Sequence, residues 1–154
     1  MLEDEPPLRR MLEEILAMKG YASDSVATVE EAVRLWSREM AGPNPFRLAL
    51  TDLTLGDGPG GLEFAKRLRL LDPESRMIAC TGDSSDPVMA DSRRFGFQAT
   101  LSKPFLLGTL LETVGLVLSD PPGPAGTELR TEFPPSGCPK SPGNAKLPRL
   151  GEIP

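Results

Sequence analysis

The sequence predicts an α/β fold in which a parallel sheet carries helices on both faces. Two observations lead to this prediction. Short apolar runs alternate along the chain with patterns of helical periodicity. Polar side chains stand where several of these runs end. Strands that alternate with helices pair in parallel and become buried between two helical layers.

The N-terminal part contains two predicted helices and one predicted strand. Apolar residues at helical spacing follow Pro6-Pro7 and stop at Gly20, so they predict the first helix. Tyr21–Val26 is a predicted short strand. Thr28 is a candidate cap for the second helix because a glutamate follows three residues later. The turn over residues 42–45 then ends this helix.

Beyond this turn, predicted strands and helices alternate strictly. Asp72 precedes a proline and so marks a helix end. Asp86 is a cap followed by a first-turn proline. In chain order, the predicted elements are a strand at Leu48–Thr51, a helix at Leu62–Leu71, a strand at Met77–Cys80, a helix from Pro87 to about Phe95, a strand at Ala99–Leu101 and a helix at Leu107–Leu118.

The composition changes at Asp120. Of the 35 residues from Asp120 to Pro154, nine are proline and five are glycine, and the apolar periodicity does not continue. We therefore expect a folded domain over residues 1–118 and a disordered tail over residues 119–154.

Composition excludes several function classes. The net charge of −5, with Lys and Arg scattered, argues against direct binding of nucleic acid. We expect no membrane contact and no signal peptide, because no apolar run approaches the length that spans a bilayer. Cys80 lies in a predicted buried strand and Cys138 in the tail, so a cytoplasmic setting without a structural disulfide fits. The absence of histidine excludes a His-dependent nucleophile, a His-ligated zinc site and a phosphohistidine on this chain.

Candidate functional residues stand at three predicted strand ends and near the N-terminus. Asp52, Thr81 and Lys103 each follow an apolar run, and Glu3 and Asp4 belong to an N-terminal acidic cluster. The carboxyl ends of parallel strands meet at one edge of a sheet, where such sheets bind ligands. We therefore expect these side chains to converge.

These residue types suit phosphoryl chemistry. An aspartate such as Asp52 can attack phosphorus and form an acyl phosphate. A hard divalent cation, normally Mg²⁺, must then offset the negative charges, and Glu3 and Asp4 would complete its oxygen ligands with Asp52. Lys103 and Thr81 would supply a fixed cation and a hydroxyl donor for the phosphoryl oxygens.

Four motifs, in this order and roughly a βα unit apart, resemble the receiver (CheY-like) domain of bacterial two-component response regulators. The resemblance covers about residues 1–118. The motifs are Glu3-Asp4-Glu5-Pro6, Asp52, Thr81-Gly82 and Lys103-Pro104-Phe105.

Three further stretches look most similar to the C-terminal receivers of hybrid sensor histidine kinases. They are Asp52-Leu53-Thr54-Leu55, Asp86-Pro87-Val88-Met89 and Phe95-Gly96-Phe97.

The resemblance implies a flavodoxin-like, doubly wound sheet of five parallel strands in the order 2-1-3-4-5. It also implies roles for individual residues. Asp52 is the expected phosphoacceptor. Asp4 is an expected direct Mg²⁺ ligand, Glu3 the partner acid acting through water, and Thr54 a ligand through its backbone carbonyl.

Two more roles follow from the resemblance. Thr81 is the expected switch hydroxyl that moves toward the phosphoryl group. Lys103 is expected to pair with the phosphoryl oxygens, and the Lys103–Pro104 bond is expected to be cis.

The resemblance further implies a partner and an output. The expected phosphoryl donor is a phosphohistidine on a sensor histidine kinase or histidine phosphotransfer protein, which agrees with the lack of histidine here. The surface that phosphorylation creates is expected on the fourth and fifth helices, about Pro87–Phe95 and Leu107–Leu118, with the last strand. A phosphorylation-dependent dimer is a further expected partner. The domain would switch conformation or act as a relay or phosphate sink, with at most autophosphatase activity.

The sequence departs from the family pattern at two places. Only Met1-Leu2 stands where the family has a full first strand, so that strand is expected to be largely missing. Either the true start lies upstream, or the chain is a fragment of a longer kinase, or the sheet is compromised. Thr100 occupies a position that often holds an aromatic residue, which favours a relay or sink over an aromatic-switch output.

Three alternatives stay open from the residues. Residues 56–61 match a dinucleotide-binding glycine pattern, although Pro59 removes a donor amide. An aspartyl-phosphate phosphatase would need a second aspartate where Thr54 stands. A degenerate receiver that serves only as a protein-interaction domain would follow if the missing strand has removed phosphorylation.

Overall fold

The computed structural model describes residues 1–56 and 60–119. Its sheet is parallel, as the alternating pattern predicts, and it has three strands in the order β1-β2-β3 where the resemblance implies five. The strands are β1 (Ala49–Asp52), β2 (Met77–Thr81) and β3 (Ala99–Ser102). The helices are α1 (Pro6–Met18), α2 (Val29–Met40), α3 (Gly61–Leu71), α4 (Pro87–Ala90) and α5 (Leu107–Ser119), with a 3₁₀ turn η1 (Ser92–Phe95).

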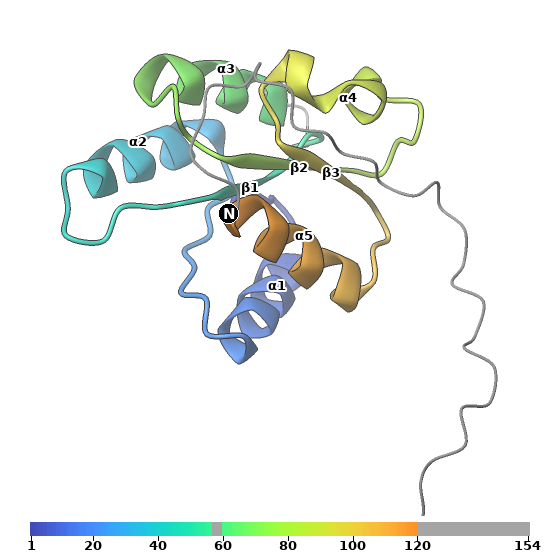
Figure 1. The fold of residues 1–154 in the computed structure, drawn as a ribbon, viewed down its shortest axis with the longest axis horizontal. Coiled ribbons are helices and arrows are strands. Elements are labelled where there is room, and N and C mark those ends of the chain that lie inside the picture. Colours follow the sequence, from blue (N-terminus) through green and yellow to red (C-terminus); the bar gives the residue numbers. More distant parts are fainter. Residues whose placement is uncertain (57–59, 120–154) are drawn as a thin grey trace, which may run out of the picture.

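Helices cover both faces of the sheet (Figure 1). On one face, α2, α3 and α4 pack against side chains that include Met77 and Ala79 of β2. On the other face, α1 and α5 pack against Ile78 and Cys80 of the same strand. Every residue of β1 and β2 is buried, because side chains that alternate along a strand meet a helical layer on either side.

The N-terminal residues occupy a central position beside β1. Leu2 forms single parallel bridges to Val26 on one side and to Thr51 on the other. Its amide donates to the Leu50 carbonyl, and its carbonyl accepts from the Asp52 amide, both over 2.9 Å. The strand positions therefore follow the expected order 2-1-3-4-5, with the first and the second each reduced to one bridged residue.

The prediction of a strand at Tyr21–Val26 is wrong. Of this segment, only Val26 forms a bridge, and residues 21–25 have no regular secondary structure. The physical reason is the short N-terminal segment beside it. A strand needs a partner along its length, and Leu2 offers a single bridged residue.

The prediction of one continuous helix from Pro87 to about Phe95 is also wrong. Asp91 interrupts it with φ −149° and ψ 75°, so the segment divides into α4 and η1. The Asp91 side chain accepts a hydrogen bond from the Arg94 amide, and such local bonds compete with a continuous helix. Gly96, at φ 92°, then ends η1 in the left-handed region that glycine favours.

Other predicted elements are confirmed within two residues at either end. Thr28 caps α2 by accepting from the Glu31 amide, and Asp86 caps α4 by accepting from the Val88 amide. The expected tail lies outside the described residues, apart from Ser119, which ends α5. In the part of the chain that the structure describes, none of the helices has the length and apolar character needed to cross a membrane.

Candidate functional site

The candidate site lies at the carboxyl edge of the sheet. The parallel register pairs Asp52 with Cys80 and Thr81 with Ser102, so β1, β2 and β3 all end at this edge. Lys103 follows β3 directly, and its amide donates to the Thr81 carbonyl over 2.7 Å. The fold therefore brings together three strand ends that are far apart in the sequence.

Asp52 is 6% exposed at the end of β1. One carboxylate oxygen, Oδ1, accepts from the Thr54 amide over 3.0 Å. The other, Oδ2, accepts from the Lys103 ammonium over 2.7 Å. These two contacts fix the orientation of the carboxylate and leave it beside the N-terminal acidic residues.

Lys103 joins two carboxylates. Its Nζ donates to Glu3 Oε2 as well as to Asp52 Oδ2, and both distances are 2.7 Å. The Lys103–Pro104 peptide bond is cis, as the resemblance implies. A single ammonium group thus neutralises part of a cluster that would otherwise hold buried charges of one sign.

Glu3 and Asp4 reach the site from the short N-terminal segment. Glu3 is 2% exposed, and its amide donates to the Val26 carbonyl over 3.1 Å. Glu3, Asp4 and Asp52 each place one carboxylate oxygen within 4.8 Å of the others. The single bridged residue Leu2 is therefore sufficient to bring both acids to Asp52.

The surroundings of Glu3 and Lys103 shift the pKa values of both groups. Burial raises the pKa of Glu3, and the Lys103 ammonium opposes this shift. Burial alone would lower the pKa of Lys103, but its hydrogen bonds and charge pairing with Asp52 and Glu3 raise it overall. Lys103 is accordingly charged at neutral pH and is held by the two carboxylates.

Two threonines lie at the site in different ways. Thr81 is fully buried, and its hydroxyl oxygen accepts from the Asp83 amide over 3.1 Å, which leaves the hydroxyl proton to donate elsewhere. Thr54 is exposed and contacts Asp52 through its backbone amide. The role of the Thr54 carbonyl as a ligand stays a prediction.

Two supporting features were missed by the sequence reasoning. Arg9 of α1 donates from Nη1 to the Glu3 carbonyl oxygen over 2.9 Å and so holds the acidic segment. Gly61 lies so close to the end of β1 that a Cβ there would collide with the Asp52 carbonyl oxygen and lie 2.5 Å from Thr51 Cγ2. The run of glycines signalled this close approach, whereas nothing in the sequence singled out Arg9.

The donor set fits a hard divalent cation. Three carboxylates lie close enough together to hold a cation, directly or through water, with the exposed loop at Thr54 beside them. Mg²⁺ prefers such oxygen ligands from few carboxylates and keeps several waters. The chemistry that this arrangement supports is the attack of a carboxylate on an electrophilic phosphorus, with negative charge offset by the cation and Lys103.

Comparison with known proteins shows the family of this chain and agrees with its fold. The family model described as "Response regulator receiver domain" matches residues 1–115. The response regulator protein PilR of Pseudomonas aeruginosa is 32% identical over 118 residues, which are 77% of this chain. The chain spans about a quarter of the length of this relative and of the transcriptional regulatory protein DctD of Rhizobium meliloti.

Solved structures of receiver domains have a similar fold. A CheY-like receiver domain protein from Methanospirillum hungatei is 27% identical with a TM-score of 0.66, over 76% of this chain and 89% of that chain. The receiver domain of the sensor histidine kinase PA1611 from Pseudomonas aeruginosa, with magnesium coordinated in its active-site cleft, has the same TM-score at 23% identity. That match covers 77% of this chain and 95% of the kinase receiver, and it supports the fold alone.

Proposed function

Because the chain belongs to the response regulator receiver domain family of two-component signalling proteins, we propose that it accepts a phosphoryl group on Asp52. The observation that supports this proposal best is the environment of the Asp52 carboxylate. It is held at a strand end between the Lys103 ammonium and the Thr54 amide, beside two further acids. Such an orientation presents a nucleophilic oxygen next to a fixed positive charge.

In the proposed reaction, the donor is a phosphohistidine on a sensor histidine kinase or a histidine phosphotransfer protein. An Asp52 oxygen forms a bond to phosphorus while the phosphorus–nitrogen bond of the donor breaks. The electron pair of that bond returns to the imidazole nitrogen. The absence of histidine from this sequence agrees with a donor group outside the domain.

Asp4, Asp52 and the Thr54 carbonyl would hold Mg²⁺ directly, and Glu3 would act through water. When bound, the ion would offset the repulsion between the carboxylates and the incoming phosphoryl oxygens. Lys103 would leave its contact with Asp52 and pair with a phosphoryl oxygen, because the phosphorylated side chain carries its charge further out.

Thr81 would complete the switch. Its hydroxyl accepts from the Asp83 amide, and its proton could be donated to a phosphoryl oxygen. Thr100 supplies no aromatic ring on the neighbouring strand, so we propose that the domain serves as a relay or phosphate sink. Phosphorylation-dependent dimerisation would use α4, β3 and α5.

Intact mass after incubation with acetyl phosphate and Mg²⁺ tests this function. We expect the mass of one phosphoryl group to be added to the protein. Asp52→Asn is the control, because an amide has no nucleophilic oxygen but similar size. We expect no adduct in this variant and none when Mg²⁺ is omitted; an adduct that persists in Asp52→Asn would contradict the proposal.

One observation favours a second candidate, an interaction domain that is not phosphorylated. The acidic segment is joined to the sheet through the single bridged residue Leu2. If the N-terminal residues fray, Glu3 and Asp4 leave Asp52 and no adduct forms. The same mass experiment separates the two functions when folding is confirmed by circular dichroism.

A further inference from the structure

The turn that leads from Asp4 into α1 lacks the usual helix cap. Glu5 is the N-cap residue, but its side chain makes no capping hydrogen bond. An N-cap side chain commonly accepts from the amide of the second or third helical residue, and the second residue here is Pro7, which has no N–H. The direction of the Asp4 carboxylate depends on the backbone on either side of it. Another contact must therefore hold this turn.

Arg9, the fourth residue of α1, supplies that contact. Its Nη1 donates to the Glu3 carbonyl over 2.9 Å, and its backbone amide donates to the Glu5 carbonyl over 3.0 Å. Asp4 stands between these two residues, so Arg9 holds the chain on both sides of it. The bond to Glu3 is partly buried, and a charged donor makes a stronger hydrogen bond than a neutral one.

The guanidinium of Arg9 holds the backbone and leaves the carboxylates to other partners. Within residues 1–56 and 60–119, it forms no ion pair with Glu3, Asp4 or Asp52, and the ion pairs of this cluster come from Lys103. The dipole of a helix disfavours a positive side chain near its N-terminus, so α1 gains no electrostatic stability from an arginine here. The bond to the Glu3 carbonyl is thus the specific contribution of this guanidinium.

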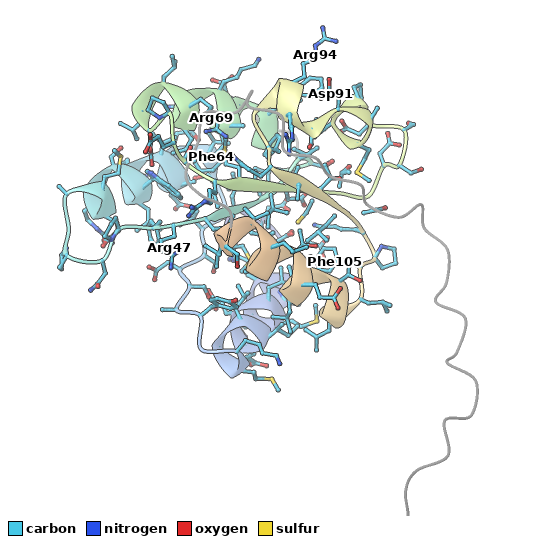
Figure 2. All side chains as sticks on the ribbon, in the orientation of Figure 1. Arg47, Phe64, Arg69, Asp91, Arg94 and Phe105 are labelled. Carbon is cyan, nitrogen blue, oxygen red and sulfur yellow. The ribbon has the colours of Figure 1, made fainter. Side chains whose placement is uncertain are left out.

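Other basic residues do not duplicate this contact. Arg69 of α3 and Arg94 of η1 lie on the face of the sheet opposite α1 (Figure 2). Arg10 follows Arg9 on α1 but is exposed, and in the described part of the chain its side chain makes no hydrogen bond. Consecutive residues of a helix point in different directions. Arg10 therefore has the same charge on the same helix without the contact to Glu3.

We propose that Arg9 is a positioning residue for the cation of the candidate site. This inference rests on the proposed use of Mg²⁺ beside Asp52. By bonding to the Glu3 carbonyl, Arg9 fixes the turn that presents the Glu3 and Asp4 carboxylates. It thereby raises the affinity for the cation, although its own positive charge acts against binding. Contacts that orient the residues around a metal typically contribute about 10–100-fold to metal affinity.

The two effects of Arg9 on cation binding have opposite signs. A positive charge near the site repels a divalent cation, so loss of the charge alone would tighten binding. Loss of the bond to Glu3 would release the turn and weaken binding. A variant without this side chain therefore shows by the direction of the change which effect is larger.

Calorimetric titration of the full chain with Mg²⁺ at constant ionic strength measures this direction. We expect Arg9→Met to bind Mg²⁺ about tenfold more weakly than the unaltered protein. Arg10→Met is the matched control, because it loses the same charge from the neighbouring position. It should bind Mg²⁺ as tightly as the unaltered protein or more tightly. Arg9→Lys keeps a donor and the charge, so it should regain part of the lost affinity.

Hydrogen exchange without Mg²⁺ tests the position of the segment independently of the metal. The Glu3 amide donates to the Val26 carbonyl over 3.1 Å, and we expect it to lose protection in Arg9→Met but not in Arg10→Met. The Ala49 amide, which is hydrogen-bonded at the start of β1, reports on the stability of the sheet. Its exchange should be unchanged in both variants.

Three results would overturn the inference. Equal or tighter Mg²⁺ binding by Arg9→Met would show that its bond to Glu3 does not position the cation site. Equal loss of protection at Glu3 and Ala49 would show a general loss of stability. In either case, the proposed function stands if the unaltered protein gains a phosphoryl group from acetyl phosphate. The third result is an unaltered protein that neither binds Mg²⁺ nor gains this group, which would overturn the inference and the proposed function together.

Discussion

At the scale of the residue, Lys103 supplies the positive charge that offsets two carboxylates of the candidate site. Its ammonium lies 2.7 Å from a carboxylate oxygen of both Glu3 and Asp52, and both acids are buried. Removing one partner of a buried ion pair leaves an uncompensated charge, which costs more than the intact pair contributes. The same ammonium competes with any cation for these oxygens.

We predict that Lys103→Met lowers the stability of the protein by about 3 kcal/mol at neutral pH without Mg²⁺. Mg²⁺ should restore part of this loss, because it replaces the missing positive charge. Thermal unfolding with and without Mg²⁺ measures both effects. The increase in Tm on adding Mg²⁺ should be larger in the variant than in the unaltered protein.

Lys66→Met is the matched control for this prediction. Lys66 lies exposed on α3, so its loss should change neither the stability nor the response to Mg²⁺ by more than about 0.5 kcal/mol. Equal responses to Mg²⁺ in all three proteins would show that Lys103 and the cation do not share a site.

At the scale of the element, the connection from β1 to α3 determines how Asp52 is presented. The chain turns back across the end of β1, and the Gly61 amide donates to the Leu53 carbonyl over 3.3 Å. Gly60 and Gly61 approach the backbone of this strand end too closely for a side chain. The first turn of α3 is thereby packed directly on the residue that is proposed to accept the phosphoryl group.

We predict that Gly61→Ala destabilises the protein by about 1–3 kcal/mol, because the added Cβ forces the strand end and the helix apart. Urea unfolding followed by Trp36 fluorescence measures the change. Phosphorylation by acetyl phosphate should slow in the same variant, since the Asp52 carbonyl must move.

Gly108→Ala is the control within a helix. A Cβ on Gly108 meets nothing within 4 Å, and alanine favours helix over glycine by about 1 kcal/mol. This variant should therefore be as stable as the unaltered protein or more stable. A Gly61→Ala variant with the same unfolding midpoint as Gly108→Ala would refute the close approach.

At the scale of the whole molecule, two helical layers exclude water from the central strand. Cys80 of β2 is 3% exposed in the layer of α1 and α5. Burial raises the pKa of its thiol to about 12 from its ordinary value of 9.0. The thiol can therefore report on opening of the whole fold.

We predict a loss of stability above about pH 9 that depends on Cys80. The unfolded chain releases the thiol proton near pH 9, whereas the folded chain retains it until about pH 12. The unfolded state thus binds fewer protons in this window, and stability falls with rising pH by up to about 1.4 kcal/mol per pH unit.

Urea unfolding at several pH values, in a Cys138→Ser background, measures this slope. The comparison is with Cys80→Ala in the same background, which should have a shallower slope in that window. The remaining slope would include Lys103, whose raised pKa acts in the same direction above 10.5. Identical slopes would show that the Cys80 thiol is accessible in the folded state.

The sequence determined most elements of the fold, because apolar periodicity and capping residues are local signals. Thr28 and Asp86 cap helices as expected, and Asp52, Thr81 and Lys103 stand at strand ends as expected. Their convergence followed from the parallel topology alone. The division of Pro87–Phe95 at Asp91 was not predictable, because a side-chain hydrogen bond to the Arg94 amide competes there with helix periodicity.

Only the tertiary structure decided how the N-terminal segment is used. The sequence predicts a missing strand and a strand at Tyr21–Val26; in the fold, Leu2 bridges Val26 and Thr51, and this one residue brings Glu3 to Lys103. Pairing between distant segments depends on which backbone edges meet in space, and no local pattern in the chain encodes that.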